Sequence, residues 1–428
     1  MRVYHLYDLY KLSTNQWKTP EYLRKIQTIK LRRLIRHAYE KVPYYRELFY
    51  SLKIKPYDIR KLEDLQKLPL TTKKQLHELS LKEKTARGID VKRCRSLSTS
   101  GTTGIPLKMF FTPQDSTLMN LTWARAFLAC GMKPWYKMVA FIGQQKVKPK
   151  KSWYEHFGLW RRKEISTWDK SEYWITEIQK QNPQILVGYV MTFKLLEEAI
   201  QKHQIKDINP KTIFHSSSIL DSFSRKHLEK VFHTSIKDFY GSEEAGNIAW
   251  ECEKCGGYHI NSDTLIVEVL DNNKQVNPGE QGEVVITNLH SYAMPFIRYQ
   301  QKDIVTSSEK KVRCGRGFPL LEQIKGRTDD FIVLENGRRI PSHPLYHCIV
   351  HIPGIKRWRM IQEKINKLKV EIEPGAGYGI HTQKTIENNL KKLIRDKMEI
   401  EICKVDSILI NPSSKFRSVL SYVSKDVL

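Results

Sequence analysis

Short apolar segments alternate with segments of helical periodicity from about residue 98 onward, and this alternation limits the folds open to the chain. The strand-like segments span residues 138–142, 185–190, 213–214 and 236–239, and the helical ones include residues 193–202 and 222–232. Strands that alternate with helices predict an α/β sheet with helices packed on it. A helix with periodic apolar residues precedes the sheet at residues 21–42 and ends before Pro43.

The pattern changes twice along the second half of the chain. Predicted strands at 265–270, 282–288 and 303–306 follow one another from about residue 258. After Gly326, an alternating strand around Leu368–Ile372 precedes a helix whose apolar face runs from Ile386 to Met398. Because 428 residues exceed one ordinary core, we predict two domains. They are a large N-terminal α/β domain over residues 1–326, with a β-rich subdomain at about 258–326, and a small α+β domain over residues 327–428.

The chain is strongly basic, with 72 Lys and Arg against 46 Asp and Glu and a net charge of +26. This charge favours anionic partners such as acidic glycans, an acidic membrane face or phosphate-bearing small molecules. A lysine-rich, solvated surface explains the charge equally well. The basic residues are spread along the chain and no nucleic-acid motif is present, so we predict no specific nucleic-acid partner.

No apolar run approaches the ~20 residues of a membrane span, and the first residues lack the apolar core of a secretory signal. The seven cysteines form an odd set, which favours reduced thiols over a disulfide framework. We therefore expect a cytoplasmic protein that could associate with the acidic face of the membrane.

Residues 98–108, STSGTTGIPLK, combine hydroxyl side chains, glycines and a lysine. The second glycine that the Walker A pattern requires is replaced by Pro106, so this is a different kind of loop. Gly101 and Gly104 let backbone N–H groups turn toward an anion, and the hydroxyls and Lys108 add donors and positive charge. The composition suits a polyphosphate, although an ordinary surface turn has a similar one.

This loop resembles the phosphate loop of the adenylate-forming superfamily, which includes acyl-CoA synthetases, nonribosomal adenylation domains and luciferases. Further stretches resemble other motifs of that superfamily in the same order: DFYGSEE at 238–244, MPFIRYQQKD at 294–303, IKGRTDD at 324–330 and SKFR at 414–417. Within the superfamily the chain is most similar to the phenylacetate–CoA ligase-like branch, which includes capsule-biosynthesis adenylating proteins. That likeness is carried by HAYEKVPYYR at 37–46, Glu251-Cys252 and MPFIRY at 294–299.

The resemblance implies the nucleotide site. Residues of the loop that would bind the ATP phosphates are Ser100, Gly101, Thr102, Thr103, Gly104 and Lys108. Backbone around Ser217 would face the adenine, Tyr240 would stack on it, and Gly241 belongs to the same motif. Asp303 would accept hydrogen bonds from the ribose hydroxyls, assisted by Arg327. Individually, Tyr240 is equally explained as a core residue.

The resemblance also implies the catalytic groups, which are Glu244, Lys415 and Arg327. Glu244 would ligate Mg²⁺, a cation that prefers oxygen ligands. Lys415 would contact the substrate carboxylate and the α-phosphate and stabilise developing charge. As a single residue, Glu244 is equally explained as a surface carboxylate. The sequence departs from the superfamily pattern at Glu243, at Gln301-Lys302 and at Ser414, and the lost hydroxyl at position 243 puts the phosphate or metal contacts in question.

The cysteines suggest a second site. Cys252, Cys255 and His259 have ligand types and spacing compatible with Zn²⁺, and Cys314 is a candidate fourth ligand. Related ligases sometimes hold zinc here through a Cys-x-Cys-Gly-Arg element, of which Val312 replaces the first cysteine. Four protein ligands would make the zinc structural, and reduced structural thiols are the alternative.

The resemblance implies a two-step ligase: ATP and a carboxylic acid give an acyl-adenylate, and coenzyme A or a sugar or amine acceptor then displaces AMP. The C-terminal domain would be a mobile lid that turns about Asp329 between the two steps. One alternative is an adenylating transferase of capsular polysaccharide biosynthesis that never uses CoA. Another is a catalytically degenerate binding protein. The acid, the acceptor and the oligomeric state are left open by the sequence.

Overall fold

The computed structural model describes residues 3–98, 107–143, 153–216, 220–327, 331–336, 338–350, 352–408 and 418–423. The chain packs into two compact units, each with its own core. The first contains Met1–Gln301 and Val305–Ile324, and the second contains Lys302–Ile304 and Lys325–Leu428. The domain boundary at residue 326 stays a prediction.

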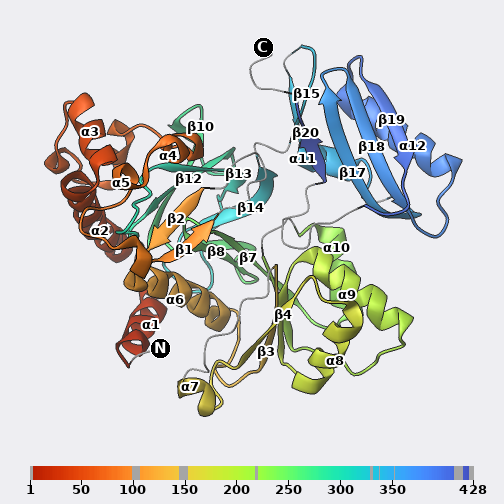
Figure 1. The fold of residues 1–428 in the computed structure, drawn as a ribbon, viewed down its shortest axis with the longest axis horizontal. Helices are drawn as coiled ribbons and strands as arrows, with labels where there is room; N and C mark the ends of the chain where they lie inside the picture. Colours follow the sequence, from red (N-terminus) through yellow and green to blue (C-terminus); the bar gives the residue numbers. More distant parts are fainter. Residues whose placement is uncertain are drawn as a thin grey trace. The chain divides into compact units, whose positions relative to one another are not determined.

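The first unit begins with helices (Figure 1). They are α1 (Val3–Asn15), α2 (Pro20–Lys41), α3 (Pro43–Ser51), α4 (Lys73–Glu78) and α5 (Leu81–Lys84), with short 3-10 turns η1 (Pro56–Asp58), η2 (Leu62–Lys67) and η3 (Val91–Arg93). Helix α2 confirms the helix predicted at 21–42. The side chain of Thr19 caps its first turn, Pro20 starts it, and its periodic apolar residues are buried.

A sheet of twelve strands runs through the described residues. Its strand order is β11-β10-β12-β13-β14-β9-β8-β7-β6-β5-β3-β4. The strands in chain order are β3 (Met138–Ile142), β4 (Arg162–Ser166), β5 (Ile185–Gly188), β6 (Thr212–Ser216), β7 (Ile236–Ser242), β8 (Gly246–Cys252), β9 (Gly257–Ile260), β10 (Leu265–Asp271), β11 (Lys274–Gln275), β12 (Gln281–Asn288), β13 (Tyr299–Ser307) and β14 (Leu320–Arg327). Strands β3 to β7 are parallel, and β7 pairs antiparallel with β8.

Helices cover both faces of the parallel strands, which confirms the α/β class. Helices α8 (Ser171–Gln181), α9 (Val190–Lys202) and α10 (Ser222–Val231) connect the strands and pack on one face, and α7 (Trp153–His156) is a short turn before β4. Helix α6 (Pro113–Ala129) packs on the other face, where Phe127 contacts the rings of Phe214 and Phe239. With both faces covered, β3 (sequence MVAFI) and β5 (sequence ILVG) are continuous apolar runs.

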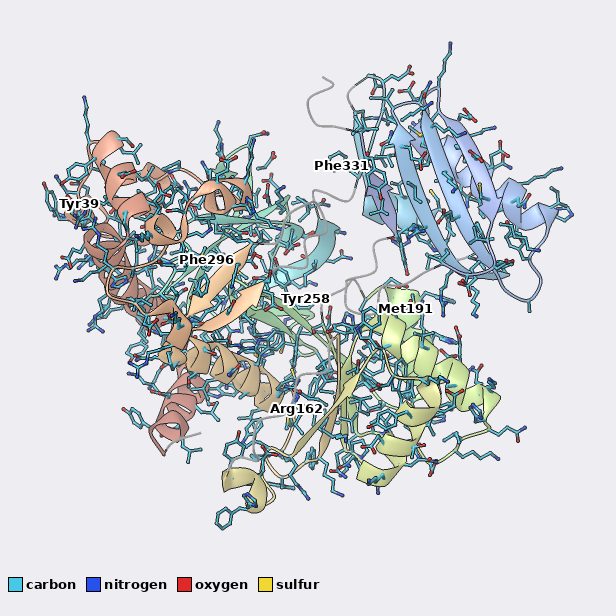
Figure 2. All side chains as sticks on the ribbon, in the orientation of Figure 1. Tyr39, Arg162, Met191, Tyr258, Phe296 and Phe331 are labelled. Carbon is cyan, nitrogen blue, oxygen red and sulfur yellow. The ribbon has the colours of Figure 1, made fainter. Side chains whose placement is uncertain are left out.

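The strands predicted at 265–270, 282–288 and 303–306 are present as β10, β12 and β13. They are hydrogen-bonded in series with the parallel strands through β8 and β9, so the β-rich region extends the α/β sheet instead of forming a separate one. Figure 2 shows the side chains, with Tyr258 on this antiparallel part of the sheet.

The second unit has a sheet of the order β19-β18-β17-β20 and a small pair of strands, β15 with β16. Its elements are β15 (Phe331–Val333), β16 (Arg339–Pro341), α11 (Ser342–His347), β17 (Ile355–Lys364), β18 (Lys367–Pro374), α12 (Ile380–Ile394), β19 (Glu399–Lys404) and β20 (Val419–Ser421). Helix α12 ends before Arg395, which has the left-handed φ of 51°. Met398, predicted on the face of this helix, therefore lies beyond it and packs partly buried against the same core.

No helix in the described parts of the chain combines the length and the apolar character that crossing a bilayer requires.

Candidate functional site

The glycine-and-hydroxyl loop is carried by a β-hairpin. Strands β1 (Arg95–Ser98) and β2 (Lys108–Phe111) pair antiparallel, with Ser98 opposite Lys108. The predicted phosphate ligands Ser100, Gly101, Thr102, Thr103 and Gly104 lie outside the described residues. Lys108 is exposed at the base of the loop. The hairpin thus holds the two ends of the loop side by side.

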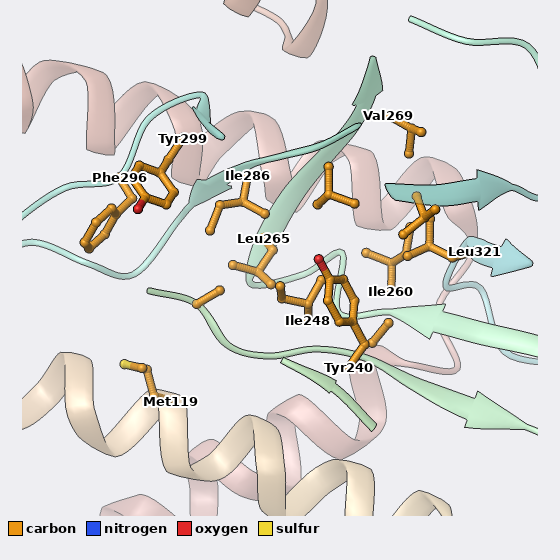
Figure 3. Close-up of a cluster of buried hydrophobic side chains, with 14 of the residues drawn as sticks. Met119, Tyr240, Ile248, Ile260, Leu265, Val269, Ile286, Phe296, Tyr299 and Leu321 are labelled. Atoms are coloured by element: carbon orange, nitrogen blue, oxygen red, sulfur yellow. The ribbon is translucent and has the colours of Figure 1, made fainter. Parts of the chain in front are cut away.

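The hairpin shares a buried core with the motif around Tyr240. Leu107, Met109 and Phe111 are fully buried, and they belong to the same cluster as Tyr240 and Tyr299. Figure 3 shows the two tyrosines among the aliphatic side chains of this cluster. Tyr240 is 7% exposed, so its ring is a core side chain in this structure. A core residue was one of the two interpretations that the sequence allowed for Tyr240. Packing therefore fixes the loop-bearing hairpin relative to the end of β7.

Gly241 is required by close packing at the end of β7. A Cβ atom at this position would lie 2.5 Å from the carbonyl oxygen of Gly246 and 2.8 Å from Cζ2 of Trp123. The strand pairing shifts register between Tyr240 and Gly241, and Gly246 closes the turn with a φ of +74°. The turn that joins β7 to β8 is consequently tight, and Glu244 lies within it.

Glu244 is 7% exposed, which excludes the surface carboxylate that the sequence left open. Its carboxylate oxygen Oε1 accepts a hydrogen bond of 3.0 Å from the hydroxyl of Tyr299. Its backbone carbonyl accepts one of 2.8 Å from Nδ2 of Asn288. Neither Tyr299 nor Asn288 is among the predicted site residues. Tyr299 lies within the stretch MPFIRYQQKD, and its position in that stretch was the signal that could have found it.

The remaining predicted residues are described only in part. Asp303 is half-buried on β13, in the short segment that groups with the second unit. Only the backbone of Arg327 is described, at the end of β14. Ser217 and Lys415 lie outside the described residues. Their places in a nucleotide site remain predictions from the resemblance.

The candidate zinc ligands lie together in the first unit. Cys252 ends β8, Cys255 lies in the following turn, His259 is on β9, and Cys314 comes from the segment before β14. Their ligand atoms all lie within 4.8 Å of one another, with Nε2 of His259 3.1 Å from Sγ of Cys314. Three sulfurs and one imidazole nitrogen at this spacing fit a tetrahedral Zn²⁺ site.

The surroundings orient the histidine for metal binding. Its Nδ1 lies 3.1 Å from the carbonyl oxygen of Phe318, which only accepts hydrogen bonds, so Nδ1 carries the proton and Nε2 faces the sulfurs with its lone pair. Burial lowers the pKa of His259 to about 4, which keeps the imidazole neutral. Burial also raises the pKa of the Cys252 thiol to about 11. A bound cation would favour the thiolate and release that proton.

The residues that follow Cys314 in the chain also contact the N-terminal segment. Arg316, two residues after Cys314, donates from Nε to Oε1 of Gln16 at 2.9 Å, and its guanidinium lies 4.6 Å from the ring centroid of Trp17. A Cβ atom at Gly317 would lie 1.8 Å from the carbonyl oxygen of Lys18, so only glycine fits there. A metal held by the cluster would therefore stabilise the β8–β9 hairpin and the start of the chain together.

Replacement of Cys252 by serine is expected to remove the bound metal and lower the melting temperature by roughly 5 °C or more, because a structural zinc contributes directly to folding. Elemental analysis of the purified protein and a thermal melt measure the two effects. The control is Cys130→Ser, since Cys130 lies in the same unit outside the cluster. A metal-free wild-type protein with the melting temperature of the Cys252→Ser variant would contradict a zinc site.

Comparison with known proteins gives matches to a family model, to individual protein sequences and to solved structures. A family model described as the CapK C-terminal domain matches residues 332–422. The phenylacetate–coenzyme A ligase of Aromatoleum evansii is 27% identical over 424 residues, which cover 89% of this chain and 90% of that protein. Protein CapK of Staphylococcus aureus is 27% identical over 163 residues, 38% of this chain and 35% of CapK.

Among solved structures, 2-hydroxyisobutyryl-CoA ligase in the postadenylation state, in complex with 2-HIB-AMP, has a TM-score of 0.77 and 19% identity. The match covers 93% of this chain and 89% of that one. This likeness confirms the predicted fold. Together with the sequence matches, it also confirms the resemblance drawn from the motifs.

Proposed function

We propose that this chain, a homologue of phenylacetate–coenzyme A ligases with the fold of adenylate-forming ligases, activates a carboxylic acid with ATP and transfers the acyl group to coenzyme A. The observation that carries the proposal is a shared core. The hairpin that bears the glycine-and-hydroxyl loop packs with Tyr240, directly before the turn that presents the buried carboxylate of Glu244. A buried carboxylate that follows Tyr240, in the same packed region as the hairpin that carries the proposed polyphosphate loop, suits a site for magnesium–ATP.

In the first step, a carboxylate oxygen of the acid attacks the α-phosphorus of ATP, and the bond to pyrophosphate breaks. The loop at residues 98–108 binds the β- and γ-phosphates, Asp303 accepts hydrogen bonds from the ribose, and Lys415 stabilises charge between the acid and the α-phosphate. Magnesium held by Glu244 would neutralise phosphate charge. In the second step, the thiol of coenzyme A attacks the acyl carbon and AMP leaves. The net positive charge of the chain favours recruitment of the CoA phosphates.

ATP–pyrophosphate exchange against a panel of aryl, amino and hydroxy acids tests the first step. We expect isotope exchange into ATP that depends on one class of acid and on magnesium. Addition of CoA with the active acid should then give a thioester and AMP. Absence of exchange with every acid, in a protein that is folded by its thermal melt, would contradict the proposal.

A second candidate is an adenylating transferase of surface polysaccharide assembly that does not use CoA. The match of residues 332–422 to the CapK C-terminal domain and the partial match to protein CapK favour it. The same assay separates the two: pyrophosphate release with an active acid, but no CoA ester, favours the transferase. An acidic glycan acceptor would also suit the positive charge of the chain.

A further inference from the structure

We propose that Tyr299 is a positioning residue for Glu244, and that its hydroxyl sets the direction in which this carboxylate meets a magnesium–ATP complex. The inference rests on the proposed function, because it takes Glu244 as the magnesium ligand. The two residues are 55 positions apart in sequence and come from β13 and the β7–β8 turn.

In the part of the chain that the structure describes, one side-chain hydrogen bond reaches the carboxylate of Glu244. The side chain is more than nine-tenths buried, and the hydroxyl of Tyr299 donates to its Oε1 at 3.0 Å. Among the described residues, no Lys, Arg or His forms an ion pair with it. Burying an ionised carboxylate is costly unless a positive charge or several donors compensate. The bond to Oε1 leaves Oε2 as the oxygen that can meet a cation.

The backbone of the same residue is held as well. Nδ2 of Asn288 donates to the carbonyl oxygen of Glu244 at 2.8 Å, and Asn288 is fully buried. The side-chain oxygen of Asn288 accepts from the backbone N–H of His290 at 3.1 Å, which fixes the orientation of the amide. Residues of β12 and β13 thus hold both the main chain and the side chain of Glu244.

The tyrosine itself has little freedom. Tyr299 is 2% exposed, and its ring packs edge-on against Phe296 with centroids 5.3 Å apart. The preceding residue, Arg298, forms a two-point ion pair with Glu268. Backbone hydrogen bonds join Thr71 to both Arg298 and Gln300. The position of the hydroxyl is therefore set by the packing of β13, which is what a positioning group requires.

Tyr299→Phe removes the hydroxyl and keeps the ring in place. We expect the magnesium concentration for half-maximal ATP–pyrophosphate exchange to rise roughly 10-fold, as for loss of a group that orients a metal ligand. The KM for the acid should stay within about 2-fold, because the tyrosine acts through Glu244. A merely structural role would lower the amount of folded protein without moving the magnesium dependence.

Tyr258→Phe is the matched control. The hydroxyl of Tyr258 also donates to a buried carboxylate, Oδ2 of Asp238, at 2.7 Å in the same unit. This variant should keep the magnesium dependence of the wild type. A double-mutant cycle adds Glu244→Gln, alone and with Tyr299→Phe. If the tyrosine acts through Glu244, the double variant should be no worse than Glu244→Gln alone.

Equal magnesium dependence of the Tyr299→Phe and Tyr258→Phe variants, or additive losses in the cycle, would overturn the positioning role with the proposed function intact. Manganese–ATP binding, followed by electron paramagnetic resonance of Mn²⁺, gives a readout that needs no acid. If no acid supports exchange but Tyr299→Phe still weakens manganese–ATP binding relative to Tyr258→Phe, the proposed function fails and the positioning role stands. A wild-type protein that binds no manganese–ATP would overturn both.

Discussion

Replacement of Lys415 by alanine is expected to lower the rate of acyl-adenylate formation by about 100- to 1,000-fold, as for loss of one group that stabilises transition-state charge. The expectation follows from the proposed contact of Lys415 with both the acid and the α-phosphate. ATP–pyrophosphate exchange with the active acid measures it. Because Lys415 is proposed to serve the first step only, thioester formation from a chemically prepared acyl-adenylate and CoA should stay close to the wild-type rate.

Lys392→Ala is the control for this prediction. Lys392 is exposed in the last turn of α12 in the second unit and is not among the proposed site residues, so its removal takes away one positive charge without removing a proposed ligand. Equal exchange rates for the wild type and Lys415→Ala would contradict the role of Lys415. Equally low rates in both proteins would favour the catalytically degenerate binding protein that the departures at Glu243, Gln301-Lys302 and Ser414 leave open.

The fold was predictable where burial leaves a simple pattern. The predicted segment 138–142 coincides with β3, because a parallel strand covered on both faces is continuously apolar. Strands β8 and β9 were missed, since they carry polar side chains whose partners lie on other elements: Tyr258 with Asp238 on β7, and Glu251 with Arg225 on α10. The start of β13 at Tyr299 was missed because its residues 300–303 are polar.

The residue types of the candidate site could be predicted from the sequence. The residues that hold them in place by hydrogen bonds could not. The zinc ligands could be proposed from spacing, because three of them lie within eight residues, and the hairpin geometry brings these together. The hydrogen bonds from Tyr299 and Asn288 to Glu244 depend on which strands become neighbours. That information arises only from tertiary packing, and the same is true of the buried charges that join α6 to the sheet.

One of these buried contacts is the ion pair between Arg125 on α6 and Asp263 before β10. Both side chains are fully buried, and the guanidinium makes two bonds of 2.9 Å to the carboxylate. Nδ2 of Asn15 donates to the same carboxylate at 2.9 Å, and Arg125 also contacts Asn261. Burial alone would raise the pKa of Asp263, but Arg125, together with Lys30 and Asn15, outweighs it, so that the pKa lies below its ordinary value. Nothing in the local sequence of Arg125 distinguishes it from a surface arginine.

Asp263→Asn is therefore expected to destabilise the folded state by about 3–5 kcal/mol, because it keeps the shape of the side chain but leaves the charge of Arg125 buried without a counter-charge. The midpoint and slope of urea unfolding measure the change. The comparison is Glu63→Gln, which breaks the exposed pair of Glu63 with Arg24 and should cost less than about 1 kcal/mol. Because Asn261 donates to Asn247 on β8, the loss should also loosen the β7–β8 hairpin that presents Glu244. An Asp263→Asn variant as stable as Glu63→Gln would mean that water or a local rearrangement satisfies Arg125 in place of the carboxylate.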